Sequence, residues 1–234
     1  MNRYLTAITA AALALTLAAC GAKGDRKVNM ESKSAKLSYA LGHEVGTSLR
    51  DFKTDIDPAV LSKGIEDGLA GLKPVLSAEE MVDLKKQFMM KVQADQTEKM
   101  KSVADKNVKD EEVFFAENKK KSGVVTTASG LQYTIVTEGK GASPKATDKV
   151  SVNYRGTLLD GTEFDSSYKR GQAATFPVNG VIPGWTEALQ LMKPGGKYRL
   201  FIPARLAYAE RGAGRQIGPN AALIFEVELV SIEK

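Results

Sequence analysis

The chain has 234 residues, enough for one large domain or two ordinary ones, and 43% of them are hydrophobic, which is sufficient for a core. Its formal net charge is only +5, and basic residues alternate with acidic ones, which favours a solvated surface over a nucleic-acid-binding face. One cysteine, Cys20, and one histidine, His43, are too few for an internal disulfide or a Cys/His metal site. A Ser-His-Asp catalyst would need His43, which lies in an ordinary helical pattern and is interpreted as a surface or packing residue.

The first segment predicts export. In residues 1–19 a basic Arg3 precedes an almost wholly apolar run, which is typical of a secretory signal peptide and too short for a comfortable membrane span. The sequence Leu-Ala-Ala-Cys-Gly then resembles the lipobox of bacterial lipoproteins, in which the signal is cut before an acylated cysteine, here Cys20. The alternative is an ordinary cleavage site followed by a chance cysteine. Residues 20–34 contain few apolar groups and are expected to form a lipidated, flexible tether.

Residues 35–122 are predicted to be helical. Asp57-Pro58 indicates the start of a second helix, and the absence of proline and glycine between Ser77 and Gly123 predicts a long connecting helix of roughly 65 Å. Acidic and basic residues spaced i,i+4 support this helix from outside. The apolar stripes lie at Leu37, Leu41, Val45, Leu49, and at Val60, Leu61, Ile65, Leu69; the expected ion pairs are Asp95/Lys99, Asp105/Lys109 and Glu117/Lys121.

These helices form a layer too thin to bury its own apolar faces. A homodimer through residues 35–95 is therefore expected, with the long helices as arms. A helix that is polar all round is usually a bridge between domains or an isolated arm. The methionines Met81, Met89, Met90 and Met100 fit either the dimer core or an adaptable client-binding face, and the sequence does not separate the two.

Residues 123–234 change to an alternation of period two, which predicts strands. Asp160-Gly161 predicts a hairpin, and one short helix is expected at Pro183–Met192, closed by a Pro-Gly-Gly run. The predicted architecture is α+β: an antiparallel sheet wrapped on a short helix, preceded by an all-α dimerisation domain with a long connecting helix. The alternating runs are Leu131/Tyr133/Ile135, Val150/Val152/Tyr154, Tyr198/Leu200/Ile202 and Leu223/Phe225/Val227/Leu229.

Several ordered motifs in this half resemble the FKBP signature. They are VNYRG at 152–156, DGTEFDSS at 160–167, VIPGW at 181–185, LAY at 206–208 and ALIFEVEL at 222–229. The resemblance covers essentially all of residues 123–234. Residues 35–121 more loosely resemble the N-terminal domain of macrophage infectivity potentiators, which are periplasmic or surface lipoproteins. Together these resemblances imply a peptidyl-prolyl cis-trans isomerase domain behind a dimerisation domain.

The resemblance also implies a site. Trp185 would form the floor under the proline ring, while the backbone N–H of Ile182 and the hydroxyl of Tyr208 would hold substrate carbonyls. Asp165 would face the twisting carbonyl carbon. Taken singly, each aromatic is better explained by core packing, but the resemblance implies that the set lines one concavity. Asp165 also fits a turn or cap residue. The other positions carried over are Tyr154 and Arg170, which would orient Asp165, Ile217 on the rim, and Phe164, Phe176, Val181 and Phe225 in the wall.

One residue, one loop and one short segment depart from the family pattern. Ala209 follows Tyr208 where the family has glycine, which costs about 1 kcal/mol if the backbone needs a positive φ. The loop 210–218 is charged and glycine-rich, where the family often has apolar rim residues. Because 175–180 is short, Phe176 could match either of two pocket phenylalanines.

The predicted chemistry needs no nucleophile, metal or cofactor, because no bond is broken, so none is expected. The expected partners are unfolded or proline-containing polypeptides, the membrane through Cys20, and macrolide FKBP inhibitors. An outer-membrane lipoprotein facing the periplasm or the cell surface, with chaperone activity, fits these features. One alternative is a non-catalytic dimeric chaperone or scaffold with a vestigial pocket, against which Asp165, Trp185 and Tyr208 argue. Another is nucleic-acid binding through the Lys-rich arm, but no aromatic residues are interleaved with those lysines.

Overall fold

The computed structural model describes residues 29–52 and 55–233. The predicted signal peptide, Cys20 and most of the predicted tether therefore lie outside the described residues. The chain divides into two compact units, one up to Ser77 and one from Ala78 onward. Among the described residues, no helix has both the length and the apolar character needed to cross a membrane.

The first unit contains two helices, α1 (Lys33–Ser48) and α2 (Pro58–Leu69). A short 3-10 turn, η1 (Arg50–Phe52), follows α1. The Asp57 side chain accepts hydrogen bonds from the backbone N–H groups of Ala59, at 2.8 Å, and Val60, at 3.3 Å. Pro58 occupies the first turn, where its missing N–H leaves no bond unmade. The predicted Asp57-Pro58 helix start is therefore confirmed.

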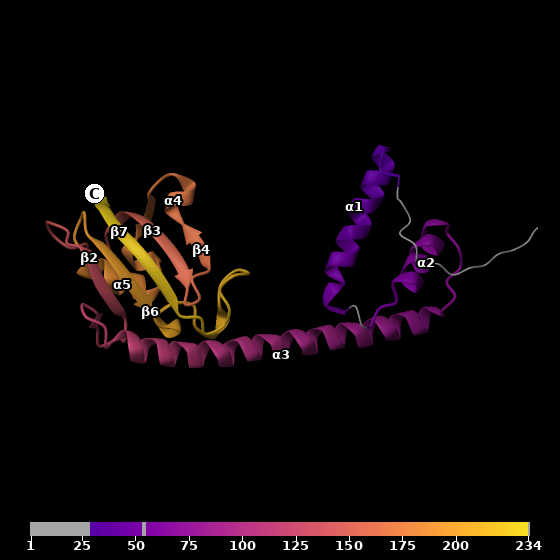
Figure 1. Ribbon diagram of the computed structural model, residues 1–234, viewed down its shortest axis with the longest axis horizontal. Coiled ribbons are helices and arrows are strands. Elements are labelled where there is room, and N and C mark those ends of the chain that lie inside the picture. Colours follow the sequence, from indigo (N-terminus) through magenta and orange to yellow (C-terminus); the bar gives the residue numbers. More distant parts are fainter. Residues whose placement is uncertain (1–28, 53–54, 234) are drawn as a thin grey trace, which may run out of the picture. The chain divides into compact units, whose positions relative to one another are not determined.

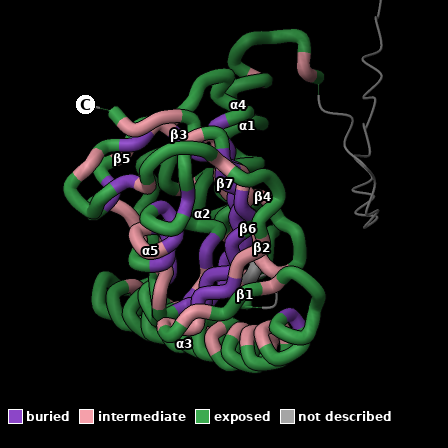
Figure 2. The backbone as a smooth tube through the Cα atoms, turned by 90° about the vertical axis from the view of Figure 1, so that its left-hand side faces the viewer, coloured by how far each residue is buried: buried purple, intermediate pink, exposed green. Residues whose placement is uncertain are grey.

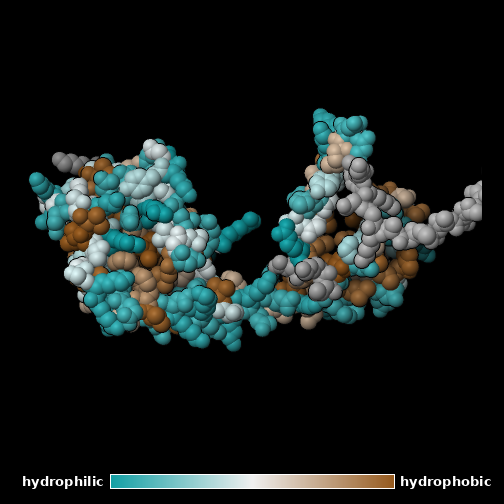
Figure 3. Space-filling view, in the orientation of Figure 1, coloured by the Kyte–Doolittle hydropathy of each residue, from teal (hydrophilic) through white to brown (hydrophobic). Residues whose placement is uncertain are grey.

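The apolar faces of α1 and α2 remain at the surface. Neither helix buries a residue. Leu41 is 55% exposed, Ile65 46% and Leu69 86%, and Figure 3 shows hydrophobic residues, in brown, gathered on the surface over α2. Burying a leucine or isoleucine side chain completely stabilises a protein by about 1.5–3 kcal/mol relative to leaving it exposed. Covering these stripes would therefore add hydrophobic stabilisation that the single chain lacks.

Helix α3 (Ala78–Asn118) is continuous over 41 residues, about 60 Å at 1.5 Å per residue. Because α3 ends at Asn118, Lys121 lies beyond the helix and does not form the expected i,i+4 ion pair with Glu117. Glu117 instead contacts Lys120, three residues on, at 2.6 Å. The Lys121 ammonium lies 5.8 Å from the centre of the Phe114 ring.

The second unit contains one antiparallel sheet of seven strands in the order β1-β2-β6-β7-β3-β4, with β5 also paired to β3 (Figure 1). The predicted hairpin at Asp160-Gly161 is confirmed, because Gly161 has φ 87° and its N–H donates to the Leu158 carbonyl at 3.1 Å. The strands are β1 (Val125–Thr126), β2 (Gln132–Thr137), β3 (Lys149–Leu158), β4 (Glu163–Ser166), β5 (Ala174–Pro177), β6 (Lys197–Ile202) and β7 (Leu223–Glu233).

Helices and turns fill the connections. The predicted short helix is α5 (Pro183–Leu191), and a one-turn helix, α4 (Ser167–Arg170), follows β4. Three 3-10 turns complete the unit: η2 (Val178–Gly180) precedes α5, while η3 (Ala204–Leu206) and η4 (Ala209–Arg211) follow β6.

One face of the sheet forms the hydrophobic core with α5. Successive side chains of a strand point to opposite faces, so alternate residues of β3, β6 and β7 share this core. Figure 2 shows the buried backbone, in purple, concentrated in these central strands. The fully buried members include Val152, Leu189, Leu200 and Leu223.

The C-terminal part of α3 covers the opposite face of the sheet. The Phe114 ring lies 5.7 Å from the ring of Phe201, a β6 residue that is only 6% exposed. The Asn118 amide donates to the Gln132 side-chain oxygen at 2.9 Å, and the Gln132 amide donates to the Phe115 carbonyl at 3.1 Å. This part of α3 is therefore one layer of the second unit, and the sequence-based alternative of an isolated arm is wrong for it.

The predicted alternation fails at the end of β2. Leu131 is fully buried, and Tyr133 stacks on Tyr198 with ring centres 5.5 Å apart, as the period-two pattern requires. Ile135, however, is 41% exposed. Ile135 is still paired with Tyr198 of β6, and the register shifts only beyond it, between Ile135 and Thr137, so the exposed position lies at the irregular end of the strand.

Candidate active site

A hollow of about 640 Å³ opens beside α5, within the usual range for small-ligand pockets. The predicted site residues all line it except Arg170, which lies behind Asp165. Gly180 and residues 213–216 of the loop 210–218, which were not assigned individually from the sequence, complete the lining. The lining residues are Tyr154, Phe164, Asp165, Phe176, Gly180, Val181, Ile182, Trp185, Tyr208, Ala213, Gly214, Arg215, Gln216, Ile217 and Phe225.

Trp185 is the hub of a cluster of rings beneath this hollow. It follows Pro183 in the first turn of α5 and is only 4% exposed. Its ring centre lies 5.2 Å from Tyr154, 5.1 Å from Phe225 and 6.0 Å from Phe176, with interplanar angles of 82–88°. Edge-to-face pairs of this kind contribute about 0.5–1.5 kcal/mol each beyond their buried area, so the floor of the pocket is rigid and apolar.

Gly156 of β3 makes room for two further rings. A Cβ atom at this position would lie 2.7 Å from atoms of both Phe164 and Phe225, closer than real Cβ contacts. Those two rings meet edge to face at 5.5 Å. The glycine of the VNYRG motif therefore allows the rings of Phe164 and Phe225 to pack directly against the backbone of β3.

Asp165 stands at the edge of the ring cluster in a network with two partners. The Tyr154 hydroxyl donates to one carboxylate oxygen at 2.5 Å, and the Arg170 guanidinium donates to the other at 2.5 Å. Arg170 also donates to the Tyr154 hydroxyl at 2.7 Å, and the Ser166 backbone N–H donates to Asp165 at 2.8 Å. The carboxylate is thereby fixed in orientation while its side chain stays 42% exposed toward the pocket.

Opposing effects set the charges in this network. Partial burial alone raises the pKa of Asp165, but the hydrogen bonds from Tyr154 and Arg170 outweigh it and hold that pKa below its ordinary value of 3.8. Burial, assisted by the neighbouring carboxylate, raises the pKa of Tyr154 above 10.0. Around neutral pH the site therefore presents an ionised carboxylate and a protonated phenol.

Two polar groups face the hollow from the other side. Ile182 lies just before α5 in an extended conformation, and its backbone N–H makes no hydrogen bond within the described part of the chain. The Tyr208 side chain is 39% exposed. Ala209, the residue after it, has φ 48°, so the position where the family pattern has glycine does adopt the left-handed conformation.

One supporting residue was missed by the sequence-based assignment. Ser167 is fully buried, and its hydroxyl accepts a hydrogen bond from the Tyr154 backbone N–H at 2.8 Å, which ties α4 to β3 directly behind Asp165. A serine after a turn motif gives no signal of such a long-range contact. Over the described ranges, no group of three or more His, Cys, Asp or Glu side chains is arranged to hold a metal ion.

Comparison with known proteins identifies the class that this fold and pocket define. The family model described as FKBP-type peptidyl-prolyl cis-trans isomerase matches residues 140–230, and the domain amino-terminal to that isomerase matches residues 34–135. The chain belongs to the FKBP-type peptidyl-prolyl cis-trans isomerases, and as a member of that family it isomerises the bond before proline.

Individual relatives agree over most of the chain. The outer membrane protein MIP of Legionella longbeachae is 42% identical over 97% of both chains. The peptidyl-prolyl cis-trans isomerase Mip of Coxiella burnetii is 44% identical over 88% of this chain and 89% of its own. The crystal structure of FkpA from Escherichia coli, 38% identical, superposes with a TM-score of 0.68 over 87% of this chain and 98% of that chain. The sequence-based family and fold assignments are therefore confirmed.

The charge states predict a flat pH profile of activity. Since the pKa of Asp165 lies below 3.8 and that of Tyr154 above 10.0, neither group changes protonation between about pH 5 and 9. We expect kcat/KM for a short X–Pro peptide, followed by NMR exchange, to vary less than about twofold over that range and to fall only in more acidic solution, where Asp165 takes up a proton at its lowered pKa. An inflection between pH 6 and 8 would contradict this assignment of charges.

Proposed function

We propose that the hollow beside Trp185 binds the proline ring and carries out the isomerisation. The ring cluster supplies a rigid apolar floor, and the free N–H of Ile182 and the Tyr208 hydroxyl hold the carbonyls on either side of the bond. Asp165, oriented by Tyr154 and Arg170, faces the twisting carbonyl carbon. The observation that carries this proposal is the apolar hollow with an ionised, fixed carboxylate at its edge.

The barrier to be lowered is the loss of amide resonance, about 18–20 kcal/mol, which makes the unassisted X–Pro exchange take tens to hundreds of seconds. The planar amide is more charge-separated than the twisted one, so water stabilises it more. A dry floor of rings removes that advantage of the planar form. A carboxylate fixed beforehand stabilises the twisted carbonyl carbon without having to reorganise during the reaction.

This assignment predicts that the polar groups of the pocket carry activity. In the chain without its leader, we expect Asp165→Ala and Tyr208→Phe each to slow the exchange of an X–Pro peptide at least about tenfold, equivalent to ~1.4 kcal/mol of barrier. Tyr168→Phe is the matched control, because Tyr168 is 51% exposed and does not line the hollow. Equal rates for a folded Asp165→Ala and wild type would refute the assigned role of the carboxylate, and an inactive wild type would refute the pocket as an active site. A macrolide FKBP inhibitor is expected to compete with the peptide.

We further propose that residues 35–95 form a homodimer. The exposed stripes of α1 and α2 and the exposed Met89, 63%, and Met90, 63%, of α3 are the apolar faces that a second copy would cover. A dimer would place two pockets on one particle, which raises the effective concentration of a second proline site on a bound unfolded chain. Chaperone activity toward such chains follows from the same arrangement.

A charge placed in the α1 stripe is expected to separate the two copies. Leu41 is 55% exposed in the single chain and α1 has no buried residue, so Leu41→Asp leaves no core cavity in one protomer but places a carboxylate in the proposed interface. Analytical ultracentrifugation should show a dimer for wild type and a monomer for Leu41→Asp, while Lys36→Asp on the same helix stays dimeric. A monomeric wild type at micromolar concentration, or a dimeric Leu41→Asp, would contradict the proposed interface.

The leader supports a proposal about localisation. One relative is named an outer membrane protein, and we propose that Cys20 is acylated here and anchors the chain to the outer membrane. A single acyl chain anchors weakly, whereas several on one residue anchor stably. In cells that make the full chain, wild type should sediment with membranes and Cys20→Ser should be soluble and unlipidated. Membrane association that survives Cys20→Ser would refute the anchor.

A further inference from the structure

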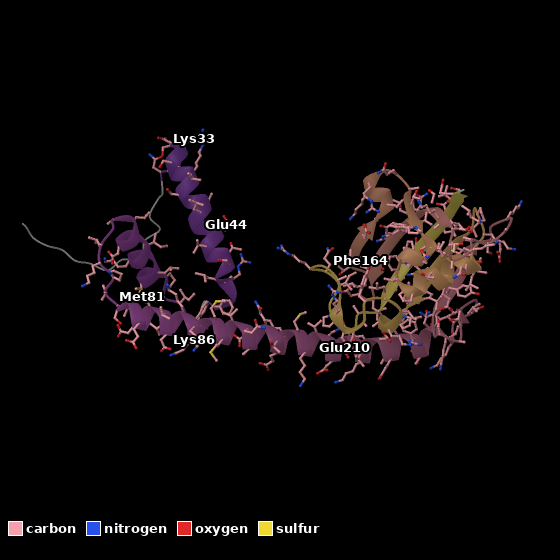
Figure 4. The ribbon with its side chains drawn as sticks, turned by 180° about the vertical axis from the view of Figure 1, so that it is seen from behind. Lys33, Glu44, Met81, Lys86, Phe164 and Glu210 are labelled. Carbon is pink, nitrogen blue, oxygen red and sulfur yellow. The ribbon has the colours of Figure 1, made fainter. Side chains whose placement is uncertain are left out.

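One wall of the pocket is an irregular segment, residues 203–220 between β6 and β7. It carries Tyr208 and Ile217, and its only ordered features are η3, η4 and an isolated bridge in which Ala213 and Ile217 exchange backbone hydrogen bonds of 2.8 and 3.1 Å. Short turns of this kind do not fix the position of a wall by themselves. Besides a hydrogen bond from Arg205 to the Ser129 carbonyl, residues of α3 contact the segment at each of its two ends. Figure 4 labels Glu210, a residue of this segment.

The first end of the segment is bound by Glu111. Its carboxylate accepts a hydrogen bond from the Ala204 backbone N–H at 2.7 Å, four residues before Tyr208. Glu111 is half-buried, and this burial raises the pKa of its carboxyl above the ordinary value, although the bond to Ala204 acts in the other direction.

The second end is bound by Asn107, one helical turn earlier on the same face of α3. Its amide donates to the Pro219 carbonyl at 2.8 Å, two residues after Ile217. The backbone also passes close to the helix here, because a Cβ atom on Gly218 would lie 3.0 Å from the Val103 side chain. Two polar residues at i and i+4 on α3 therefore hold both ends of the wall.

Backbone strain shows why the wall needs this support. Ala209 has φ 48° and Asn220 has φ 55°, the only two non-glycine residues with positive φ in the described part of the chain. The Asn220 N–H donates to the Ala209 carbonyl at 2.8 Å, so the two left-handed residues are joined directly. Asparagine tolerates this conformation, but alanine does so only where its surroundings determine it. Asn107, bound to the residue before Asn220, supplies that constraint directly beside Tyr208.

We propose that Asn107 and Glu111 are positioning residues of the isomerase, which makes α3 a structural part of the substrate pocket. Their contacts with Ala204 and Pro219 fix the positions of Tyr208 and Ile217 in the pocket wall. The position of this wall determines which substrate residues beside the proline can enter the pocket. The proposal rests on the assignment of the pocket as the active site. It gives the long helix a role in substrate choice that is separate from joining the two units.

The test uses the whole chain without its leader and a series of X–Pro peptides that differ in the residue before proline. We expect Asn107→Ala and Glu111→Ala each to lower kcat/KM about three- to tenfold, the effect of losing one partly buried hydrogen bond, and to change the order of preference among the peptides. Glu111→Gln keeps the accepting oxygen and should behave as wild type. Glu112→Ala, the exposed neighbouring carboxylate, is the matched control. The backbone amide resonances of 208–217 should shift in the two alanine variants only.

Unchanged kcat/KM and unchanged peptide preference in both alanine variants, beside an active wild type, would overturn the inference. So would a uniform loss that Glu111→Gln shares, or a loss without any shift of the 208–217 resonances, because both indicate general destabilisation of the unit. An inactive wild type, or an Asp165→Ala variant as fast as wild type, is a different result. It would refute the assigned pocket and not the support from α3.

Discussion

The packing of Trp185 against Tyr154, Phe176 and Phe225 is the interaction on which the second unit and its pocket both depend. The same rings close the core between α5 and the sheet and form the floor of the hollow. A pocket built on a core is rigid because interiors are close-packed and transmit any displacement. The floor is therefore prepared for a proline ring before the substrate arrives, and its apolar character is the property that the twisting amide needs.

The polar groups are kept at the edge of this floor, and their placement follows from the cost of burying charge. Asp165 stays partly exposed and is matched by Arg170 and the Tyr154 hydroxyl, so its charge is compensated without entering the ring cluster. The opposite wall carries Tyr208 on a strained segment that needs outside support. Helix α3 provides that support from the opposite face of the sheet. The site therefore depends on α5 on one face of the sheet and on α3 on the other.

Local patterns in the sequence predicted the elements whose cause is local. Alternation predicted the central strands, because β3, β6 and β7 each bury alternate residues, and Pro183 with the following apolar residues predicted α5. The motifs predicted the pocket lining, since the conserved geometry of a family places those positions in one concavity. Ile135 was placed in the core by its pattern, but it is 41% exposed although it still pairs with Tyr198, because it lies at the irregular end of β2.

Contacts between distant segments had no such signal. Asn107 and Glu111 meet residues 112 and 93 positions away, and in the sequence they are indistinguishable from the solvated face of a charged helix. The same holds for Ser167, whose buried bond to Tyr154 depends on how α4 folds back on β3. The sequence therefore predicts the floor of the site, while the support of its walls depends on tertiary packing.

The most direct measurement is an NMR experiment on the chain without its leader, bound to an X–Pro peptide. Trp185 is the only tryptophan of the chain, so its indole signals are unambiguous. The account predicts cross-relaxation between the proline ring protons of the peptide and the indole ring of Trp185 while exchange is accelerated. Accelerated exchange with the proline protons contacting other residues, such as the methionines of α3, and not Trp185, would contradict the central claim.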